Sequence, residues 1–189
     1  MNVYDFDGTI YHGDSTFDFF FWCLGRHPGL VRYLPIQAWG FLKRALHLTD
    51  KTGMKEYFYR FLRGIDTEQA VEEFWRTHKK NIYPYYPRQH QHTDIVISAS
   101  PEFLLWPICH DLGIQNLFAS RVDPRTGLYT GINCHGREKV RRLYEELGVD
   151  HITEFYSDAH CDLPLAKIAD KAFLVDRHGS LHPWDTTQG

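Results

Sequence analysis

Long apolar runs, closely spaced cysteines and a large net charge are all lacking in this chain of 189 residues. The main early apolar stretch, residues 17–24, is far shorter than the roughly 20 residues that a membrane-spanning helix needs. Asp5 and Asp7 precede that stretch, so we expect no signal peptide. The four cysteines contain no C-x-x-C pair, which favours a reduced, cytoplasmic setting. The net charge of −3 gives no reason to expect nucleic acid as a partner.

The most informative motif stands at the N-terminus, where an apolar stub runs into Asp5-x-Asp7-Gly8-Thr9. In a strand, residues i and i+2 point to the same side, so Asp5 and Asp7 can face one pocket at the strand's C-terminal end. Gly8 lets the backbone turn and approach a ligand closely. Two such carboxylates repel each other unless a cation lies between them or one holds a proton. The alternative is an ordinary turn, because Asp and Gly are common turn residues.

A second motif follows the β-branched run at residues 94–97, which ends in Ser98-Ala99-Ser100-Pro101. Such a run is typical of a buried parallel strand that leads into a helix. We expect Pro101 to begin that helix and Ser100 to cap it. Ser98 and the backbone N–H groups from Ala99 onward can then bind an anion.

A third motif centres on Lys139. The helical spacing of Val140, Leu143, Tyr144 and Leu147 places this lysine in the first turn of a helix. A cation there opposes the helix dipole, which makes more sense if the ammonium faces a phosphate; the alternative is a surface lysine.

A fourth motif is an apolar run that ends in Ser157-Asp158, with Asp162 four residues further on. Asp158 can supply a hard oxygen ligand to Mg²⁺, and Asp162 can orient the site from behind it. Each motif alone is a weak signal, but all four stand in order at predicted strand-to-helix junctions.

This ordered set resembles the haloacid dehalogenase-like phosphohydrolase superfamily across nearly the whole chain. The resemblance implies an α/β fold, with a doubly wound, Rossmann-like parallel sheet and an inserted helical-bundle cap. It implies Mg²⁺-dependent hydrolysis of a phosphomonoester through an aspartyl-phosphate intermediate. The implied roles are nucleophile for Asp5, acid/base for Asp7, phosphate binding for Thr9, Ser98, Ala99 and Lys139, Mg²⁺ binding for Asp5, Asp158 and the Asp7 carbonyl, and support for Ser157 and Asp162.

The organisation indicates an insertion, since the second catalytic strand begins only near Asp94. We expect residues 1–14 and 88–189 to form the core and 15–87 to form the cap, which excludes water and selects the substrate. Helices are expected at 15–26, 29–47, 51–63 and 67–81. The segment 15–87 holds 11 Lys and Arg against 7 Asp and Glu, which suits an anionic substrate. A hairpin is expected around Asp123–Gly127, and a loosely held tail from His182.

The substrate stays open at this point. A small phosphorylated metabolite is expected, and the cap arrangement resembles the phosphoserine-phosphatase-like branch. In phosphoserine phosphatase a glutamate binds the substrate amine, and this chain has Asp14 at that position. Arg60 and Arg63 are candidates for the arginine that phosphoserine phosphatase has in its cap. The bacterial phosphatidylglycerophosphatase of the superfamily is similar more widely, as in residues 7–14, 134–140 and 156–158.

The aromatic run at residues 17–22, with Trp39 and Phe41 beside several cations, has two interpretations. It forms the cap's own core, or it contacts lipid and brings the protein to a membrane surface. A dehalogenase would use one Asp nucleophile without a second carboxylate, so Asp7 is evidence against that function. A non-catalytic phosphate-binding module would not need every catalytic position filled, and a phosphotransferase or mutase would share the residues. The sequence does not indicate an oligomeric state.

Overall fold

The computed structural model describes residues 1–186 and contains one six-stranded sheet of order β3-β2-β1-β4-β5-β6. The strands are β1 (Asn2–Tyr4), β2 (Ile95–Pro101), β3 (Asn116–Ser120), β4 (Ile152–Ser157), β5 (Ala169–Val175) and β6 (Leu181–Pro183). All neighbours are parallel except β5 and β6. β1 lies in the centre, where Val3 is in register with Ile95 on one side and Phe155 on the other. The expected α/β fold with a doubly wound parallel sheet is confirmed.

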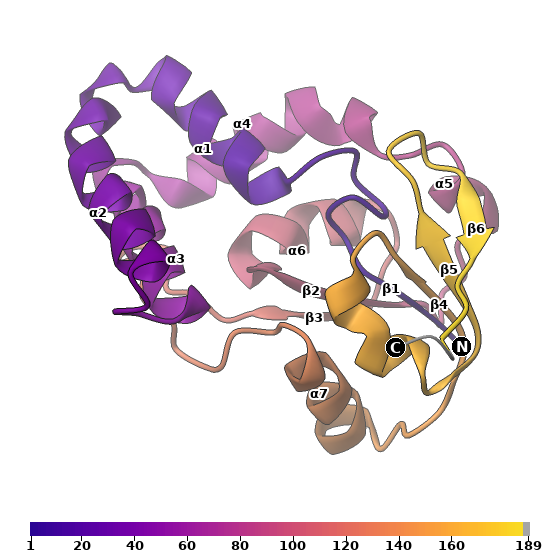
Figure 1. Cartoon of the computed structure of the whole chain (residues 1–189). Coiled ribbons are helices and arrows are strands. Elements are labelled where there is room, and N and C mark those ends of the chain that lie inside the picture. The colour runs from indigo at the N-terminus through magenta and orange to yellow at the C-terminus, as the bar shows by residue number, and fades with distance from the viewer. Residues whose placement is uncertain (187–189) are drawn as a thin grey trace.

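Helices cover both faces of this sheet (Figure 1). α6 (Glu102–Asp111) lies on one face, and α7 (Arg137–Leu147) and the short α8 (Leu163–Ala166) on the other. Tyr4 shares a buried cluster with Leu105 of α6, whereas its neighbour Val3 shares a second cluster with Leu143 of α7. Successive strand residues therefore feed opposite cores, as the two-residue period of a strand requires.

The chain between β1 and β2 is helical. It forms α1 (Ser15–Arg26), α2 (Leu34–Ala45), α3 (Lys51–Tyr59), α4 (Thr67–His78) and the short α5 (Tyr86–Gln89). The expected helix at 15–26 is confirmed. The other three are shorter than expected, because the 3-10 helices η1 (Pro28–Tyr33), η2 (Arg60–Gly64) and η3 (Lys79–Asn81) replace one end of each. Pro35 lies in the first turn of α2, where its missing N–H is tolerated, whereas a continuous helix through this position would lose a hydrogen bond.

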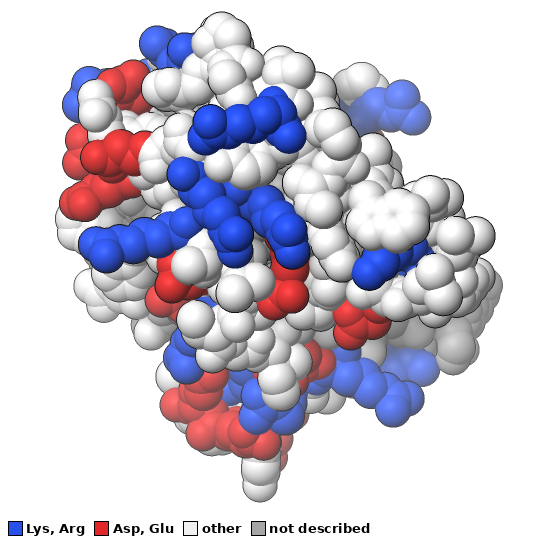
Figure 2. Space-filling model, turned by 90° about the vertical axis from the view of Figure 1, so that its left-hand side faces the viewer, with Lys and Arg blue, Asp and Glu red and all other residues white. Residues whose placement is uncertain are grey.

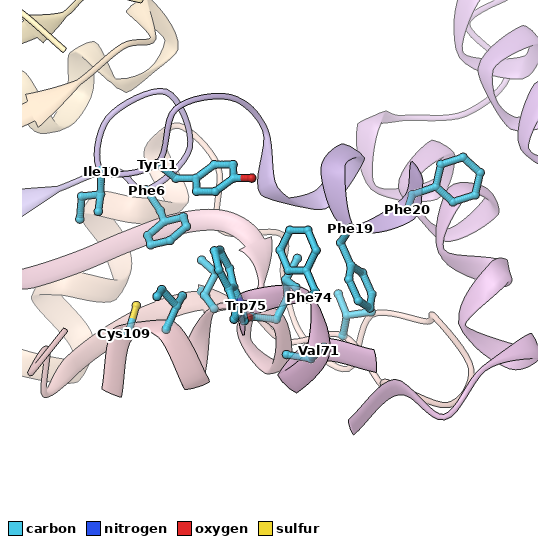
Figure 3. Packing of buried hydrophobic residues seen from close by; sticks show 14 of the residues in the cluster. Phe6, Ile10, Tyr11, Phe19, Phe20, Val71, Phe74, Trp75 and Cys109 are labelled. Carbon is cyan, nitrogen blue, oxygen red and sulfur yellow. The ribbon is translucent and has the colours of Figure 1, made fainter. Parts of the chain in front are cut away.

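The helical insert and the sheet share one buried cluster. Phe6 and Tyr11 from the loop after β1 pack with Phe74 and Trp75 of α4, and Phe19 of α1 extends the cluster (Figure 3). The Trp75 indole Nε1 donates a hydrogen bond of 2.7 Å to the Leu104 carbonyl of α6. The inner helices α1 and α4 are therefore part of the protein's core, while α2 and α3 pack on each other at the far end of the insert (Figure 1).

Two expectations are wrong, one about where a helix begins and one about the C-terminal tail. β2 continues to Pro101, so α6 begins at Glu102 and Ser100 does not cap it. The tail is not loosely held: β6 pairs with β5, and Trp184, which is 9% exposed, donates its N–H to the Ala172 carbonyl at 2.8 Å. Only the last three residues of that tail lie outside the described part of the chain.

The expected hairpin is confirmed. The Asp123 N–H donates to the Leu128 carbonyl and the Thr130 N–H to the Arg121 carbonyl, each at 2.9 Å. Among residues 1–186, no helix combines the length and the apolar character that crossing a membrane requires.

The aromatic run of α1 divides between the core and the surface. Phe19 and Phe20 are buried, whereas Phe17 is 41% exposed and Phe21 62% exposed. The outer face of α2 is also apolar and exposed, and its members are Leu34, Trp39, Phe41 and Leu42. The interpretation of these aromatics as the cap's own core therefore holds for only part of the set.

Candidate active site

The loop after β1 brings two carboxylates to the C-terminal edge of the sheet. The Asp5 N–H continues the strand ladder by donating to the Tyr156 carbonyl at 2.9 Å. The chain then turns at Gly8, whose φ of +69° lies in the region that favours glycine. A Cβ at position 8 would lie 2.1 Å from Oδ2 of Asp158. Only glycine therefore allows the carboxylate after β4 to approach the loop after β1 this closely.

Lys139 joins α7 to this edge of the sheet. Its Nζ lies 3.0 Å from Oδ1 of Asp5 and 2.6 Å from Oδ2 of Asp162, and the side chain is 2% exposed. The Ser157 hydroxyl donates to the same Asp162 oxygen at 3.0 Å. Burial by itself lowers the pKa of Lys139, but the carboxylates of Asp5 and Asp162 outweigh it and hold that pKa above its ordinary value. The ammonium is therefore charged and faces Asp5, not solvent.

Asp7 is held by two donors from other segments. Its Oδ1 accepts the Ser15 N–H at the start of α1 at 2.7 Å, and its Oδ2 accepts the Ser100 hydroxyl at the end of β2 at 2.5 Å. The Thr16 hydroxyl lies 3.0 Å from the Ser100 hydroxyl. Ser100 thus positions the Asp7 carboxylate, which is a role that the sequence did not indicate.

Burial raises the pKa of the acidic groups in this pocket. It raises the pKa of Asp5, against the opposing effect of Lys139. It also raises the pKa of Asp158. Burial and the nearby Asp14 carboxylate raise the pKa of Asp7 to about 6, even though Ser100 and Ser15 hydrogen-bond its ionised form. A group with this pKa can exchange a proton near neutral pH.

The phosphate-binding candidates do not all reach the pocket. Ser98 and Ala99 line it beside Lys139, and the Ser98 hydroxyl accepts the Ser100 N–H at 3.1 Å. Thr9 is fully buried, and its hydroxyl accepts the Asp158 N–H at 3.0 Å. Thr9 therefore fixes the position of the Asp158 loop and does not line the pocket.

A small, hard cation fits this site. Asp5 and Asp158 present carboxylates to one pocket of about 340 Å³, with the Asp7 backbone beside them. Ser15 and Ser100 hold the Asp7 carboxylate, so its backbone carbonyl is the group expected to join such a set. Within residues 1–186, no group of three or more His, Cys, Asp or Glu side chains is placed to hold a metal ion. Two carboxylates, one carbonyl and water molecules are a donor set that suits Mg²⁺.

The residues expected to determine substrate specificity do not all line the pocket. Asp14 lines the pocket, and its carboxylate also caps α1 by accepting the N–H groups of Thr16 and Phe17 at 3.0 Å. Arg60 and Arg63 do not line it: the Arg60 guanidinium lies over the Tyr57 ring, and Arg63 Nε donates to the Thr126 carbonyl at 3.1 Å. Both arginines are therefore excluded as pocket ligands in this structure.

Two cations of the insert that the sequence did not indicate reach the pocket. Lys51 and Lys55 of α3 both line it, together with His135 from the loop before α7. The spacing of four residues between Lys51 and Lys55 can be recognised in the sequence, because residues four apart lie on one face of a helix. It shows only that the two ammonium groups share a face, however, and not what that face covers. The apolar part of the pocket wall comes from Phe17, Phe41, Met54, Phe58 and Tyr59.

Comparisons with known proteins show the family of this chain. The family model of the haloacid dehalogenase-like hydrolases matches residues 3–167. Protein CicA of Caulobacter vibrioides is 28% identical over 195 residues, covering 89% of this chain and 82% of its own. A histidinol-phosphatase of Neisseria meningitidis is 31% identical over 99 residues, covering 46% of this chain and 45% of its own.

Solved structures share the fold at low sequence identity. A Bordetella pertussis protein of unknown function has a TM-score of 0.71 at 21% identity, with 91% of this chain and 87% of that chain covered. A phosphoserine phosphohydrolase-like protein of Francisella tularensis has a TM-score of 0.58 at 16% identity, with 94% and 87% covered. The family model spans most of the chain, and the pocket lies where the four motifs meet; the chain belongs to the haloacid dehalogenase-like hydrolases.

Proposed function

We propose that the protein is a Mg²⁺-dependent phosphomonoester hydrolase that acts on a small phosphorylated metabolite. The observation that carries this proposal is the Asp5 carboxylate, 3.0 Å from the buried Lys139 ammonium in a pocket shared with Asp7 and Asp158. The histidinol-phosphatase and phosphoserine phosphohydrolase-like proteins among the similar chains support a phosphate ester as the substrate class.

Asp5 is proposed as the nucleophile. Its carboxylate oxygen attacks phosphorus in line, the bond to the ester oxygen breaks, and the phosphoryl group is carried on Asp5. The Lys139 ammonium and the N–H groups of the Ser98–Ala99 segment stabilise the negative charge on the non-bridging oxygens. Water then hydrolyses the acyl phosphate and returns Asp5 to its starting state.

Asp7 is proposed as the acid and base of the two half-reactions. In its protonated form it gives a proton to the departing alkoxide, and it then takes one from the attacking water. Its pKa of about 6 places both forms within reach near neutral pH. Ser100 and Ser15 hold the carboxylate in one orientation for both steps.

The proposed Mg²⁺ would be held by Asp5, Asp158 and the Asp7 carbonyl. When bound, it neutralises phosphate charge and aligns the reacting oxygens. Thr9 and Gly8 position the Asp158 ligand of this proposed site. The Thr9 hydroxyl accepts the Asp158 N–H, and Gly8 leaves room for the Asp158 carboxylate.

Residues 15–87 are proposed as the cap over a core made of residues 1–14 and 88–189. The insert already supplies several walls of the pocket, among them Phe17, Lys55 and Phe58. Because α1, α4 and the end of α3 (Phe58 and Tyr59) all contribute to the shared buried cluster, any opening of the cap would be confined to α2 and the start of α3.

Phosphate release from 4-nitrophenyl phosphate with and without Mg²⁺ tests the proposal. We expect turnover only with Mg²⁺, and a loss of at least about 10³-fold in kcat for Asp5→Asn, because the nucleophile is gone. Mass spectrometry of quenched wild-type enzyme should find phosphate on Asp5. Normal turnover by Asp5→Asn would refute the proposed nucleophile.

A second candidate substrate class is a phosphorylated lipid. Phe17 and Phe41, 41% and 42% exposed, stand at the pocket wall and continue into the apolar outer face of α2. Lys and Arg side chains gather on this end of the molecule, where an anionic membrane surface would attract them (Figure 2). This candidate would place a cytoplasmic protein at the membrane surface.

Mixed micelles separate the two substrate classes. If the substrate is a lipid, phosphatidylglycerophosphate in micelles should be hydrolysed with a higher kcat/KM than soluble esters, and Trp39→Ser, an exposed residue of α2 outside the pocket, should lower only the micellar rate. If a soluble ester is preferred and Trp39→Ser affects both alike, the lipid candidate fails. The same panel should include phosphoserine and histidinol phosphate.

A further inference from the structure

Within the described part of the chain, the cations that α3 directs into the pocket, Lys51 and Lys55, have no carboxylate partner. Lys55 Nζ donates to the Ala99 carbonyl at 2.9 Å, and within residues 1–186 no carboxylate oxygen lies within 4.0 Å of it. Lys51 Nζ lies 2.7 Å from Nε2 of His135, which is a neutral or like-charged partner. The free protein thus holds two ammonium groups and an imidazole together beside the proposed phosphoryl site.

This arrangement is unfavourable without a ligand. Like charges four residues apart on a helix repel each other, and Lys51 also lies in the first turn of α3, where the helix dipole disfavours a cation. Burial and Lys51 lower the pKa of Lys55 to about 8. Burial and Lys51 also lower the pKa of His135. An anion between these groups would relieve the repulsion.

The location of Lys55 indicates which anion. Its partner, the Ala99 carbonyl, belongs to the segment proposed to bind the phosphoryl group, and Lys139 of α7 already pairs with Asp5. Asp14, Asp7 and Asp5 raise the pKa of Lys55 through space, but Asp5 and Asp7 are the proposed catalytic pair and Asp14 caps α1. Lys55 therefore lies next to the proposed phosphoryl site, on the part of the pocket wall that the insert forms.

We propose that Lys55 and Lys51 form a binding site for a second anionic group of the substrate, a carboxylate or a second phosphate. This inference rests on the proposed phosphatase function and narrows it to phosphate esters with two anionic groups. Lys55 is the main ligand, because it is half-buried and only one of its three N–H donors has a hydrogen-bond acceptor among the described residues. Lys51 and His135 complete the site from its rim.

Three esters that share a propyl chain test this directly. Propyl phosphate has one anionic group, 3-phosphonooxypropanoate adds a carboxylate, and 1,3-propanediol bisphosphate adds a phosphate. We expect wild-type kcat/KM to be at least tenfold higher for one of the two-anion esters than for propyl phosphate. The better of the two identifies the second anion.

Lys55→Met keeps the length and apolar stem of the side chain and removes the charge. We expect it to reduce the preference for the two-anion ester at least tenfold, mainly through KM. Lys51→Gln should reduce it less. The matched control is Lys80→Met, an exposed cation of the same insert outside the pocket, which should leave the preference unchanged.

The outcomes separate the two proposals. Hydrolysis of propyl phosphate with no preference for a second anion, or an equal loss for all three esters in Lys55→Met, overturns this inference alone. Absence of Mg²⁺-dependent release from every ester by the wild-type protein overturns the proposed function and this inference with it.

Discussion

The Ser100 hydroxyl donates a hydrogen bond of 2.5 Å to Oδ2 of Asp7 and so connects the end of β2 to the loop after β1. This bond stabilises the ionised form of Asp7 and opposes the effect of burial on its pKa. Ser100 is thereby a positioning residue for the proposed acid and base, and its removal should be visible in the pH dependence of catalysis.

Ser100→Ala should shift the alkaline limb of the pH–rate profile to higher pH. Loss of the donor raises the pKa of Asp7, so its protonated form persists to a higher pH, by about one pH unit for a hydrogen bond to a charged group. The measurement is kcat between pH 5 and 9. The control is Ser180→Ala in an exposed turn, which should leave the profile unchanged. A lower kcat with an unshifted limb would contradict the role of Ser100.

Gly8→Ala should weaken Mg²⁺ binding strongly. The new Cβ would lie 2.1 Å from Oδ2 of Asp158, so that carboxylate has to move. We expect the half-saturating Mg²⁺ concentration to rise about tenfold or more, which corresponds to about 1.4 kcal/mol. The measurement is Mg²⁺-dependent activity together with direct calorimetric titration of Mg²⁺.

Gly148→Ala is the matched control for this change. Gly148 has a similar φ of +66°, but apart from its neighbours in the chain no described heavy atom lies within 4 Å of its Cβ position. Alanine there should cost about 1 kcal/mol of stability through backbone strain alone and leave the Mg²⁺ requirement unchanged. Equal effects of the two substitutions on Mg²⁺ binding would show that strain, and not the Asp158 contact, is responsible.

Asp162→Ala should destabilise the whole protein. It leaves the buried Lys139 ammonium with one carboxylate partner in place of two, and breaking a buried ion pair costs about 3–5 kcal/mol. The free energy of unfolding from urea denaturation measures this loss. Ser157→Ala, which removes one hydrogen bond to the same oxygen, should cost only about 1 kcal/mol. If Asp162→Ala lowers the free energy of unfolding by less than about 1 kcal/mol, Asp162 does not stabilise the buried Lys139 ammonium as proposed.

Phe74→Ala should show that the inner helices and the sheet unfold together. Phe74 is fully buried in the cluster shared by α4 and the loop after β1, so its truncation should cost about 3–5 kcal/mol. Circular dichroism and tryptophan fluorescence should report one coincident, shifted transition. The control is Tyr144→Ala on α7, 62% exposed, with an expected change within about 0.5 kcal/mol. Separate transitions for the two probes would instead indicate an independent cap.

Local sequence patterns are sufficient to predict the fold class and the positions that meet at the pocket. Asp5, Ser98, Lys139 and Asp158 each follow a recognisable strand or begin a recognisable helix, and parallel strands bring their C-terminal ends to one edge. These are properties of short segments, so local patterns are sufficient to predict them. The first helix of the insert, with Asp14 as its N-cap, is local in the same sense.

The side chains that complete the site could be identified only from the folded structure. Ser100 faces Asp7 because β2 extends one residue further than a helix cap would require. Lys55, and not Arg60 or Arg63, enters the pocket because α3 ends at Tyr59 and a 3-10 turn directs the next residues away. The tail is held because Trp184 finds a buried site beside β5. Each of these outcomes depends on contacts between residues far apart in the chain, which no local pattern contains.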